Sequence, residues 1–217
     1  MQYLQWLLLV ILWGAQTVES CPDVCKCSKM PDVEKSEVNC HKKGLQDFPS
    51  DLPPDAWILK LGEYFSSIHP KAFSGAKQLM LLNLNRLHVQ CSHCNNLIRK
   101  VFLLPRLKDL LNLRFLMLGQ NQIGTLKAEM FAGLRNLSDL DLPLNALTSL
   151  PSNAFKPLIA LKVLDLSLNR IERISPKAFT GLRQLMFLNL DNNRSQEHTP
   201  FYVNVPHLHL AITKLTS

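Results

Sequence analysis

Leucine returns in this chain with a period of 24 residues. The phrase L-x-x-L-x-L-x-x-N-x-(I or L) opens at Leu113, Leu137, Leu161 and Leu185, and the last copy loses the pattern after its Asn. Three further columns keep the same period: Asn121, Asn145, Asn169 and Asn193; Phe131, Phe155 and Phe179; and Leu134, Leu158 and Leu182. A fixed period of this content predicts repeated coils, each made of a short strand and a loose returning segment.

The spacing inside the phrase determines which side chains face inward. Successive side chains of a strand point to opposite faces, so Leu164 and Leu166 should point inward while Val163 and Asp165 point outward. One coil cannot bury its apolar side alone, so stacked coils share a core and their parallel strands line one face. The Asn amide should bond to backbone groups of neighbouring coils where the chain turns out of the strand. We therefore interpret the Leu, Asn and Phe columns as structural.

This pattern is typical of leucine-rich repeats. It predicts an α/β solenoid, an arched stack of short parallel strands with mostly irregular convex segments, over residues 55–194.

Residues 1–20 have the features of a signal peptide. An apolar run extends from Trp6 to Trp13, and the small residues Val18 and Ser20 suit cleavage before Cys21. The run is shorter than the roughly 20 apolar residues of a membrane span, and no later stretch reaches that length. We expect a mature chain without a membrane span that is secreted into the extracellular space or matrix.

Four of the six cysteines lie close together near the start of the expected mature chain. These are Cys21, Cys25, Cys27 and Cys40, and six cysteines in a secreted chain fit an oxidising compartment. With the Leu-Pro and Phe-Pro segments that follow, residues 21–54 resemble the cysteine-rich N-terminal cap of extracellular leucine-rich-repeat proteins. The resemblance implies two disulfides among the four cysteines. Such a cap is needed because the first coil would otherwise expose a hydrophobic end.

The other two cysteines, Cys91 and Cys94, lie beside His88 and His93. A zinc site and a redox C-x-x-C are alternatives on residue types alone. Zinc ligands usually come as two separated pairs, and the chain has no second pair here. We interpret Cys91 and Cys94 as a disulfide in an irregular loop, and we expect no metal site and no cofactor.

The repeat is broken in two places. Leu79 and Leu113 begin successive phrases but are 34 residues apart, which places an insertion in residues 90–112. It is either a basic binding loop or an irregular repeat that the solenoid tolerates. Residues 195–217 leave the period and contain no cysteine. They are either a degenerate last coil or the end of a truncated product, and an uncapped end predicts self-association.

The outward residues of the strands form the candidate binding surface, because arched solenoids commonly bind proteins on the concave strand face. Aromatic residues are enriched at binding hot spots, and Phe115 and Phe187 should be exposed there on either side of an acidic streak. The candidate ligand-binding residues are Phe115, Met117, Asp139, Asp141, Val163, Asp165, Phe187, Asn189 and Asp191.

The charge outside the strands is basic. Removing residues 1–20 removes Glu19, which leaves 24 basic and 16 acidic side chains and a net charge of +8. Basic residues fall in the expected loops and return segments at Lys127, Arg135, Lys156, Arg173, Lys177 and Arg183. They either keep the surface soluble or contact sulfated glycans, and the expected extracellular compartment argues against nucleic acid as a partner.

Two glycosylation sequons begin at Asn136 and Asn193. Asn136 precedes a strand and should be exposed, whereas Asn193 lies in the Asn column, where its amide should be buried. We expect a glycan on Asn136 and none on Asn193.

Residues 36–63 resemble the cap and first strand of the platelet glycoprotein Ib alpha chain. This resemblance implies adhesion, with a large plasma or matrix protein bound on the concave face. The later repeats are similar to those of matrix proteoglycans and neuronal adhesion receptors as well.

Three classes of function compete. The leading hypothesis is a secreted, non-catalytic module that binds an extracellular or cell-surface protein. The second is a matrix component that binds collagen or a heparan-type glycan. The third is an enzyme or redox protein using Cys91 and Cys94, but the sequence has no nucleophile–base–acid set or phosphate loop that supports it.

Overall fold

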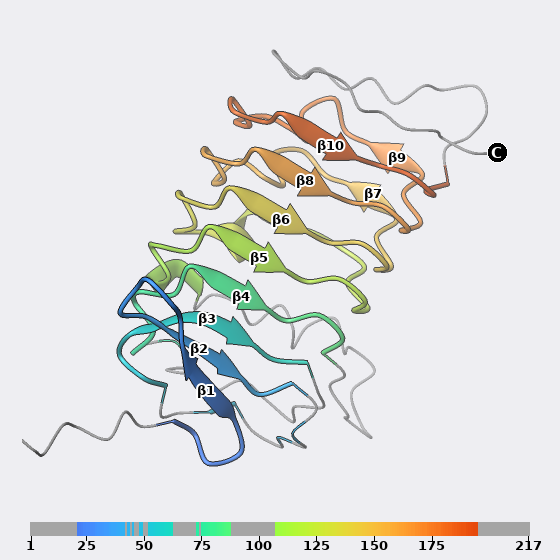
Figure 1. Ribbon diagram of the computed structural model, residues 1–217. Helices are drawn as coiled ribbons and strands as arrows, with labels where there is room; N and C mark the ends of the chain where they lie inside the picture. Colours follow the sequence, from blue (N-terminus) through green and yellow to red (C-terminus); the bar gives the residue numbers. More distant parts are fainter. Residues whose placement is uncertain are drawn as a thin grey trace, which may run out of the picture.

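The computed structural model describes residues 21–41, 43, 45, 48–49, 52–62, 73, 75–87 and 107–194. The expected signal peptide (1–20), Cys91 and Cys94, the first part of the 90–112 insertion and the 195–217 tail lie outside the described residues. The described chain winds into a stack of coils whose strands form one continuous sheet (Figure 1).

The sheet has eight strands in the order β1-β2-β3-β4-β5-β6-β8-β10. Their bounds are β1 (Lys26–Lys29), β2 (Ser36–Asn39), β3 (Ala56–Lys60), β4 (Leu81–Asn83), β5 (Phe115–Met117), β6 (Asp139–Asp141), β8 (Val163–Asp165) and β10 (Phe187–Asn189). The β1–β2 pair is antiparallel, and every later pair in this sheet is parallel. The predicted fold class, a leucine-rich-repeat solenoid of short parallel strands, is confirmed.

The inward leucines align from coil to coil and form the core. From β3 to β10 the central inward residue of each strand is in register with its neighbours, and each is at most 1 % exposed. These residues are Leu59, Leu82, Leu116, Leu140, Leu164 and Leu188. Since each strand is only three to five residues long, its pairing is stabilised mainly by this shared leucine core.

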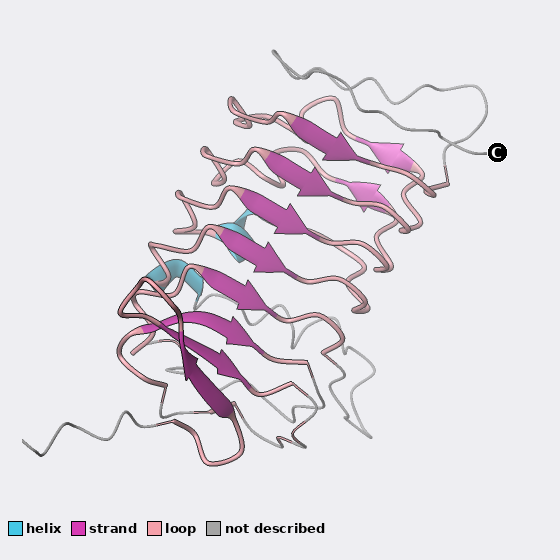
Figure 2. Ribbon diagram, in the orientation of Figure 1, coloured by secondary structure: helices cyan, strands magenta, loops and turns pink. Residues whose placement is uncertain are grey.

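The return segments lie on the opposite side of the core from the sheet (Figure 2). They contain two short 3-10 helices, η1 (Leu107–Asp109) and η2 (Ala128–Phe131), and a two-stranded parallel sheet of β7 (Ser149–Leu150) and β9 (Arg173–Ile174). The Phe column stacks between coils, with ring centroids 6.0 Å apart for Phe131 and Phe155 and 6.1 Å apart for Phe155 and Phe179.

Gly133 shows why a glycine is used in the turn after η2. Its φ is +87°, and a Cβ there would lie 2.5 Å from the Lys108 carbonyl oxygen of the preceding coil. Both facts disfavour any other residue at this position.

The cap is joined to the first coil by the sheet itself, because β2 pairs in parallel with β3. Disulfides link Cys21 to Cys27 and Cys25 to Cys40. The two disulfides implied by the cap resemblance are therefore present, and of the three pairings that four cysteines allow, the structure shows this one.

Side-chain contacts reinforce the attachment of the cap. Lys29 Nζ lies 2.8 Å from Asp55 Oδ2, and Lys60 Nζ lies 2.9 Å from Glu37 Oε1. The Phe48 and Phe73 rings meet edge to face at a centroid distance of 4.8 Å. These contacts join residues of the cap to residues of the first coil.

The last part of the expected insertion belongs to the regular repeat. Leu107 and Leu110 are fully buried and lie 24 residues before Phe131 and Leu134, so they occupy the Phe and Leu columns. Residues 107–112 therefore form an ordinary return segment before β5.

The strand face as a candidate binding surface

We call the outward surface of β3, β4, β5, β6, β8 and β10 the strand face. Eight of the nine candidate residues lie on two of its columns: Phe115, Asp139, Val163 and Phe187 in one, and Met117, Asp141, Asp165 and Asn189 in the other. The ninth, Asp191, follows β10, and its backbone N–H donates to Asn189 Oδ1. The structure thus brings the candidate residues together on one side of the sheet.

The Asn column has a structural role at the edge of this surface. Asn145 Nδ2 donates to the carbonyl oxygens of Leu118 at 2.9 Å and Leu142 at 3.0 Å. Its Oδ1 accepts from the Ile123 N–H at 3.0 Å. Asn121, Asn169 and Asn193 repeat this bonding, so that each shared carbonyl receives bonds from two successive Asn side chains. These four residues are 6 to 9 % exposed and link neighbouring coils.

A second periodic hydrogen bond, not predicted from the sequence, holds several outward polar side chains in place. At the end of β2, β4, β8 and β10 a side-chain oxygen accepts the backbone N–H two residues further on. The accepting residues are Asn39, Asn83, Asp165 and Asn189. This is the Asx turn, and a recurring Asn or Asp at the last strand position was the available signal. The side-chain oxygens of Asp165 and Asn189 therefore already stabilise the turns that follow β8 and β10.

Asp141 occupies the same column but lacks this bond, because the residue two positions on is Pro143, which has no N–H. Burial raises the pKa of Asp141, and the nearby charges of Asp165 and Asp139 raise it further. The ion pairs found among the described residues, Lys29–Asp55, Lys60–Glu37 and Arg194–Glu172, do not involve any of these three carboxylates. The centre of the strand face is thus acidic and uncompensated in the described part of the chain.

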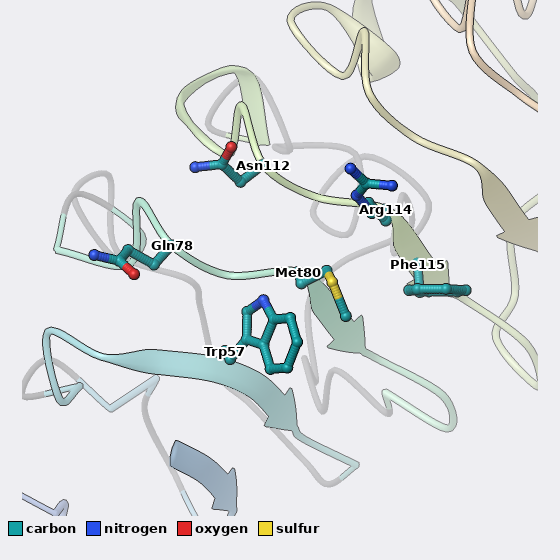
Figure 3. A pocket seen from close by; sticks show the side chains of 6 residues that line it. All are labelled: Trp57, Gln78, Met80, Asn112, Arg114 and Phe115. Atoms are coloured by element: carbon teal, nitrogen blue, oxygen red, sulfur yellow. The ribbon is translucent and has the colours of Figure 1, made fainter. Parts of the chain in front are cut away.

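An open hollow adjoins this acidic centre on the side towards the cap. Its volume is about 540 Å³, and it is lined by Trp57, Gln78, Met80, Asn112, Arg114 and Phe115. Figure 3 shows the Met80 side chain between the Trp57 indole and the Phe115 ring, with Arg114 at the rim. Phe115, which the sequence analysis expects to be exposed, is half-buried.

Trp57 and Met80 were not among the candidates, because the coils that carry them deviate from the repeat. Aligning Leu59 and Leu82 with Leu116 would have placed Trp57 and Met80 next to the column that contains Phe115.

The C-terminal part of the strand face is apolar again. Met186 is 64 % exposed and Phe187 is 37 % exposed, while Val163 beside Phe187 is half-buried. A second, polar hollow of about 450 Å³ lies near the cap and is lined by Asn39, His41, Lys60, Leu61, Asn83, Asn85, Arg86 and Gln120. The two hollows therefore flank the same strands, with the first at the starts of β3 to β5 and the polar one at their ends. The acidic centre on β6 and β8 and the exposed apolar residues near β10 follow along the stack.

The two sequons differ in accessibility. Asn136 is exposed, and its Nδ2 makes one bond, to the Leu111 carbonyl oxygen at 2.8 Å. Asn193 is 9 % exposed, and its Nδ2 donates to the carbonyl oxygens of Leu166 and Leu190. A glycan on Asn193 would replace a hydrogen that holds two coils together.

The described residues contain no group of three or more His, Cys, Asp or Glu side chains that could hold a metal ion. No helix in the described part of the chain is long and apolar enough to cross a bilayer.

Comparison with known proteins supports the architecture. Residues 135–194 match the leucine rich repeat family model, and residues 20–53 match the model of the leucine rich repeat N-terminal domain. Together with the disulfide-bonded cap, these matches support an extracellular or membrane-associated leucine-rich-repeat protein.

Two curated relatives match part of the chain. Leucine-rich repeat-containing protein 3 of Mus musculus is 46 % identical over 77 residues, which is 35 % of this chain and 29 % of the relative. Leucine-rich repeat-containing protein 3B of Danio rerio is 32 % identical over 84 residues, which is 38 % of this chain and 32 % of the relative. The match thus spans about a third of each relative's length.

Among solved structures, the crystal structure of a TLR13-ssRNA13 complex is similar, with a TM-score of 0.56 and 33 % sequence identity. The similarity covers 67 % of this chain and 19 % of that one. The comparisons therefore support a chain built from leucine-rich repeats that follow a leucine-rich-repeat N-terminal domain.

Proposed function

We propose that this chain is a secreted, non-catalytic module that binds an extracellular or cell-surface protein through the strand face. The observation that carries the proposal is the hollow of Trp57, Met80 and Phe115 beside the uncompensated carboxylates of Asp139 and Asp141. Partly exposed aromatic and thioether groups next to charged groups are typical of the anchors of protein interfaces.

A rigid scaffold supports this function. The Asn and Leu columns fix the strands in register, so little ordering entropy is lost at the strand face on binding. Three carboxylates at its centre would repel a phosphate backbone, which argues against nucleic acid at this face.

The test is a binding screen of the secreted chain against a panel of purified ectodomains and secreted proteins. Phe115→Ala and Asp141→Lys should each weaken a genuine interaction at least tenfold, while Glu129→Lys, an exposed change in η2 on the return side, should leave it unchanged. All variants should be secreted at wild-type levels. Interactions that survive both strand-face changes and are lost with Glu129→Lys would overturn the proposal.

A matrix component is the second candidate. Six basic residues of the return segments and their loops are all exposed: Lys127, Arg135, Lys156, Arg173, Lys177 and Arg183. They suit a sulfated glycan or collagen on the outside of the solenoid. Heparin binding of this kind should weaken steeply with salt, whereas an aromatic-centred protein contact should weaken less.

Two narrower hypotheses stay predictions. The resemblance of residues 36–63 to the platelet glycoprotein Ib alpha chain would make the chain an adhesion-receptor fragment. Self-association, the other hypothesis, would show as dimers in size-exclusion chromatography with light scattering.

A further inference from the structure

We infer that the protein bound on the strand face inserts an apolar side chain into the hollow of Trp57, Met80 and Phe115 and places a neighbouring lysine or arginine over Asp139 and Asp141. This inference rests on the proposed function and adds the chemistry of the partner to it.

The two halves of this site are next to each other in the sheet. Phe115 on β5 is in register with Asp139 on β6, and Met117 is in register with Asp141. Paired strands lie about 4.8 Å apart, so the apolar and acidic halves are separated by one strand spacing. Side chains that are close in space on the partner can therefore contact both halves. In an extended partner segment, alternate side chains are about 7 Å apart and could do so.

The apolar half selects an apolar side chain. Trp57, Met80 and Phe115 come from three successive coils. Each side chain is half-buried, so part of it packs against the protein and part is exposed to solvent in the hollow. An aromatic ring, leucine or methionine would cover these groups and remove them from water. The polar residues Gln78 and Asn112 and the charged Arg114 at the rim suit the wetter edge of such a contact.

The acidic half selects a cation. Asp139, Asp141 and Asp165 lie on adjacent strands without an ion pair among the described residues, so a cation placed over them would offset their mutual repulsion. Pro143 deprives Asp141 of the N–H that Asp165 receives from Ser167, so this carboxylate keeps its acceptor capacity for a partner. A lysine or arginine would offset the repulsion among the carboxylates and donate a hydrogen bond to Asp141. The described residues contain no group of three or more His, Cys, Asp or Glu side chains that could hold a metal ion, and the apolar Trp57, Met80 and Phe115 beside the carboxylates suit an organic ligand.

The experiment selects a displayed library of short random peptides for binding to the immobilised, secreted chain. Enriched peptides should combine a lysine or arginine with an aromatic residue, leucine or methionine a few positions away. They should bind at least tenfold more weakly to Asp141→Asn and to Phe115→Ala, and as tightly as before to Glu129→Gln. The last variant makes the same carboxylate-to-amide change at an exposed position of η2. Phe115→Leu replaces Phe115→Ala if the alanine variant is not secreted.

The outcomes separate the inference from the proposed function. Enriched peptides that depend on Phe115 but lack a basic residue, or bind Asp141→Asn normally, would overturn the inference and leave strand-face binding in place. Peptides that tolerate both strand-face changes would overturn the inference as well. If ectodomain partners tolerate the same changes, the proposed function fails too. An empty selection would also count against the inference.

Discussion

Replacing Asn169 by alanine tests the bonding that links the coils. Asn169 is 6 % exposed and lies in the middle of the regular repeats. Its Oδ1 accepts the Leu147 N–H at 3.2 Å, and its Nδ2 donates to the carbonyl oxygens of Leu142 at 2.9 Å and Leu166 at 3.0 Å. Its Nδ2 also lies 3.1 Å from the Ser167 carbonyl oxygen, which keeps a second bond from the Leu144 N–H. The substitution removes all four bonds at once, without changing any surface that the binding proposal uses.

The cost follows from which backbone groups keep a partner. The Leu142 oxygen retains its bond from Asn145, and the Leu166 oxygen retains its bond from Asn193. The buried Leu147 N–H, in contrast, loses its acceptor. An unsatisfied buried donor costs about 1–3 kcal/mol, and weakening the two carbonyls adds about 1 kcal/mol, so we expect a total of about 2–4 kcal/mol.

The assay is urea unfolding of the purified protein, monitored by circular dichroism. Asn112→Ala is the matched control, because Asn112 is exposed and donates one bond to the Lys77 carbonyl oxygen of the neighbouring coil. It should cost less than about 1 kcal/mol. Since solenoids can unfold in parts, the midpoint and the slope of the transition are both compared.

An Asn169→Ala midpoint equal to that of the Asn112→Ala control would refute the reasoning. It would mean that water or a backbone shift satisfies the Leu147 N–H at little cost. The Asn column would then be a consequence of the turn geometry and not a source of stability.

Three further outcomes are expected. The pKa of Asp141 is raised above its usual 3.8 by burial and then by the charges of Asp165 and Asp139. The folded state therefore binds the carboxyl proton more tightly than the unfolded chain does, and the ionised carboxylate destabilises the fold at neutral pH. Asp141→Asn should therefore raise the urea midpoint at pH 7, and the gain should fade as the pH drops through the raised pKa towards 3.8; a gain that persists unchanged at low pH would contradict this cause. Phe155→Ala removes the middle ring of the convex stack and should cost about 3–5 kcal/mol in the same unfolding assay, whereas a loss below about 1 kcal/mol would show that the stack repacks. Asn136→Gln should abolish the glycan mass of the secreted protein in mass spectrometry while Asn193→Gln leaves it intact, and the reverse pattern would show that the accessibility argument is wrong.

The inward-facing core could be read from the sequence because it repeats. Strand alternation and the 24-residue period assign each Leu and Asn to a column wherever the period is intact, as the fully buried Leu140 and Leu164 illustrate. The same reasoning located the outward candidates from Phe115 to Asp191. The four-cysteine cap was also evident from its residues, whereas its pairing of Cys21 with Cys27 was not.

The site depends on neighbours that the period does not determine. Met80 and Phe115 are 35 residues apart, and they line one hollow only because β4 and β5 pair in register despite the extra residues between them. The different states of Asp141 and Asp165 likewise follow from the Asx turn, which Pro143 prevents in one coil and Ser167 permits in the next.

The sequence by itself determined the solenoid, its core columns and its capped N-terminal end, because these follow from local alternation repeated at a fixed spacing. Only the tertiary structure decided which outward side chains share a hollow, which carboxylates have no ion pair among the described residues and which cysteines join. Lateral pairing between coils sets those contacts, and that pairing brings together residues that no local pattern relates.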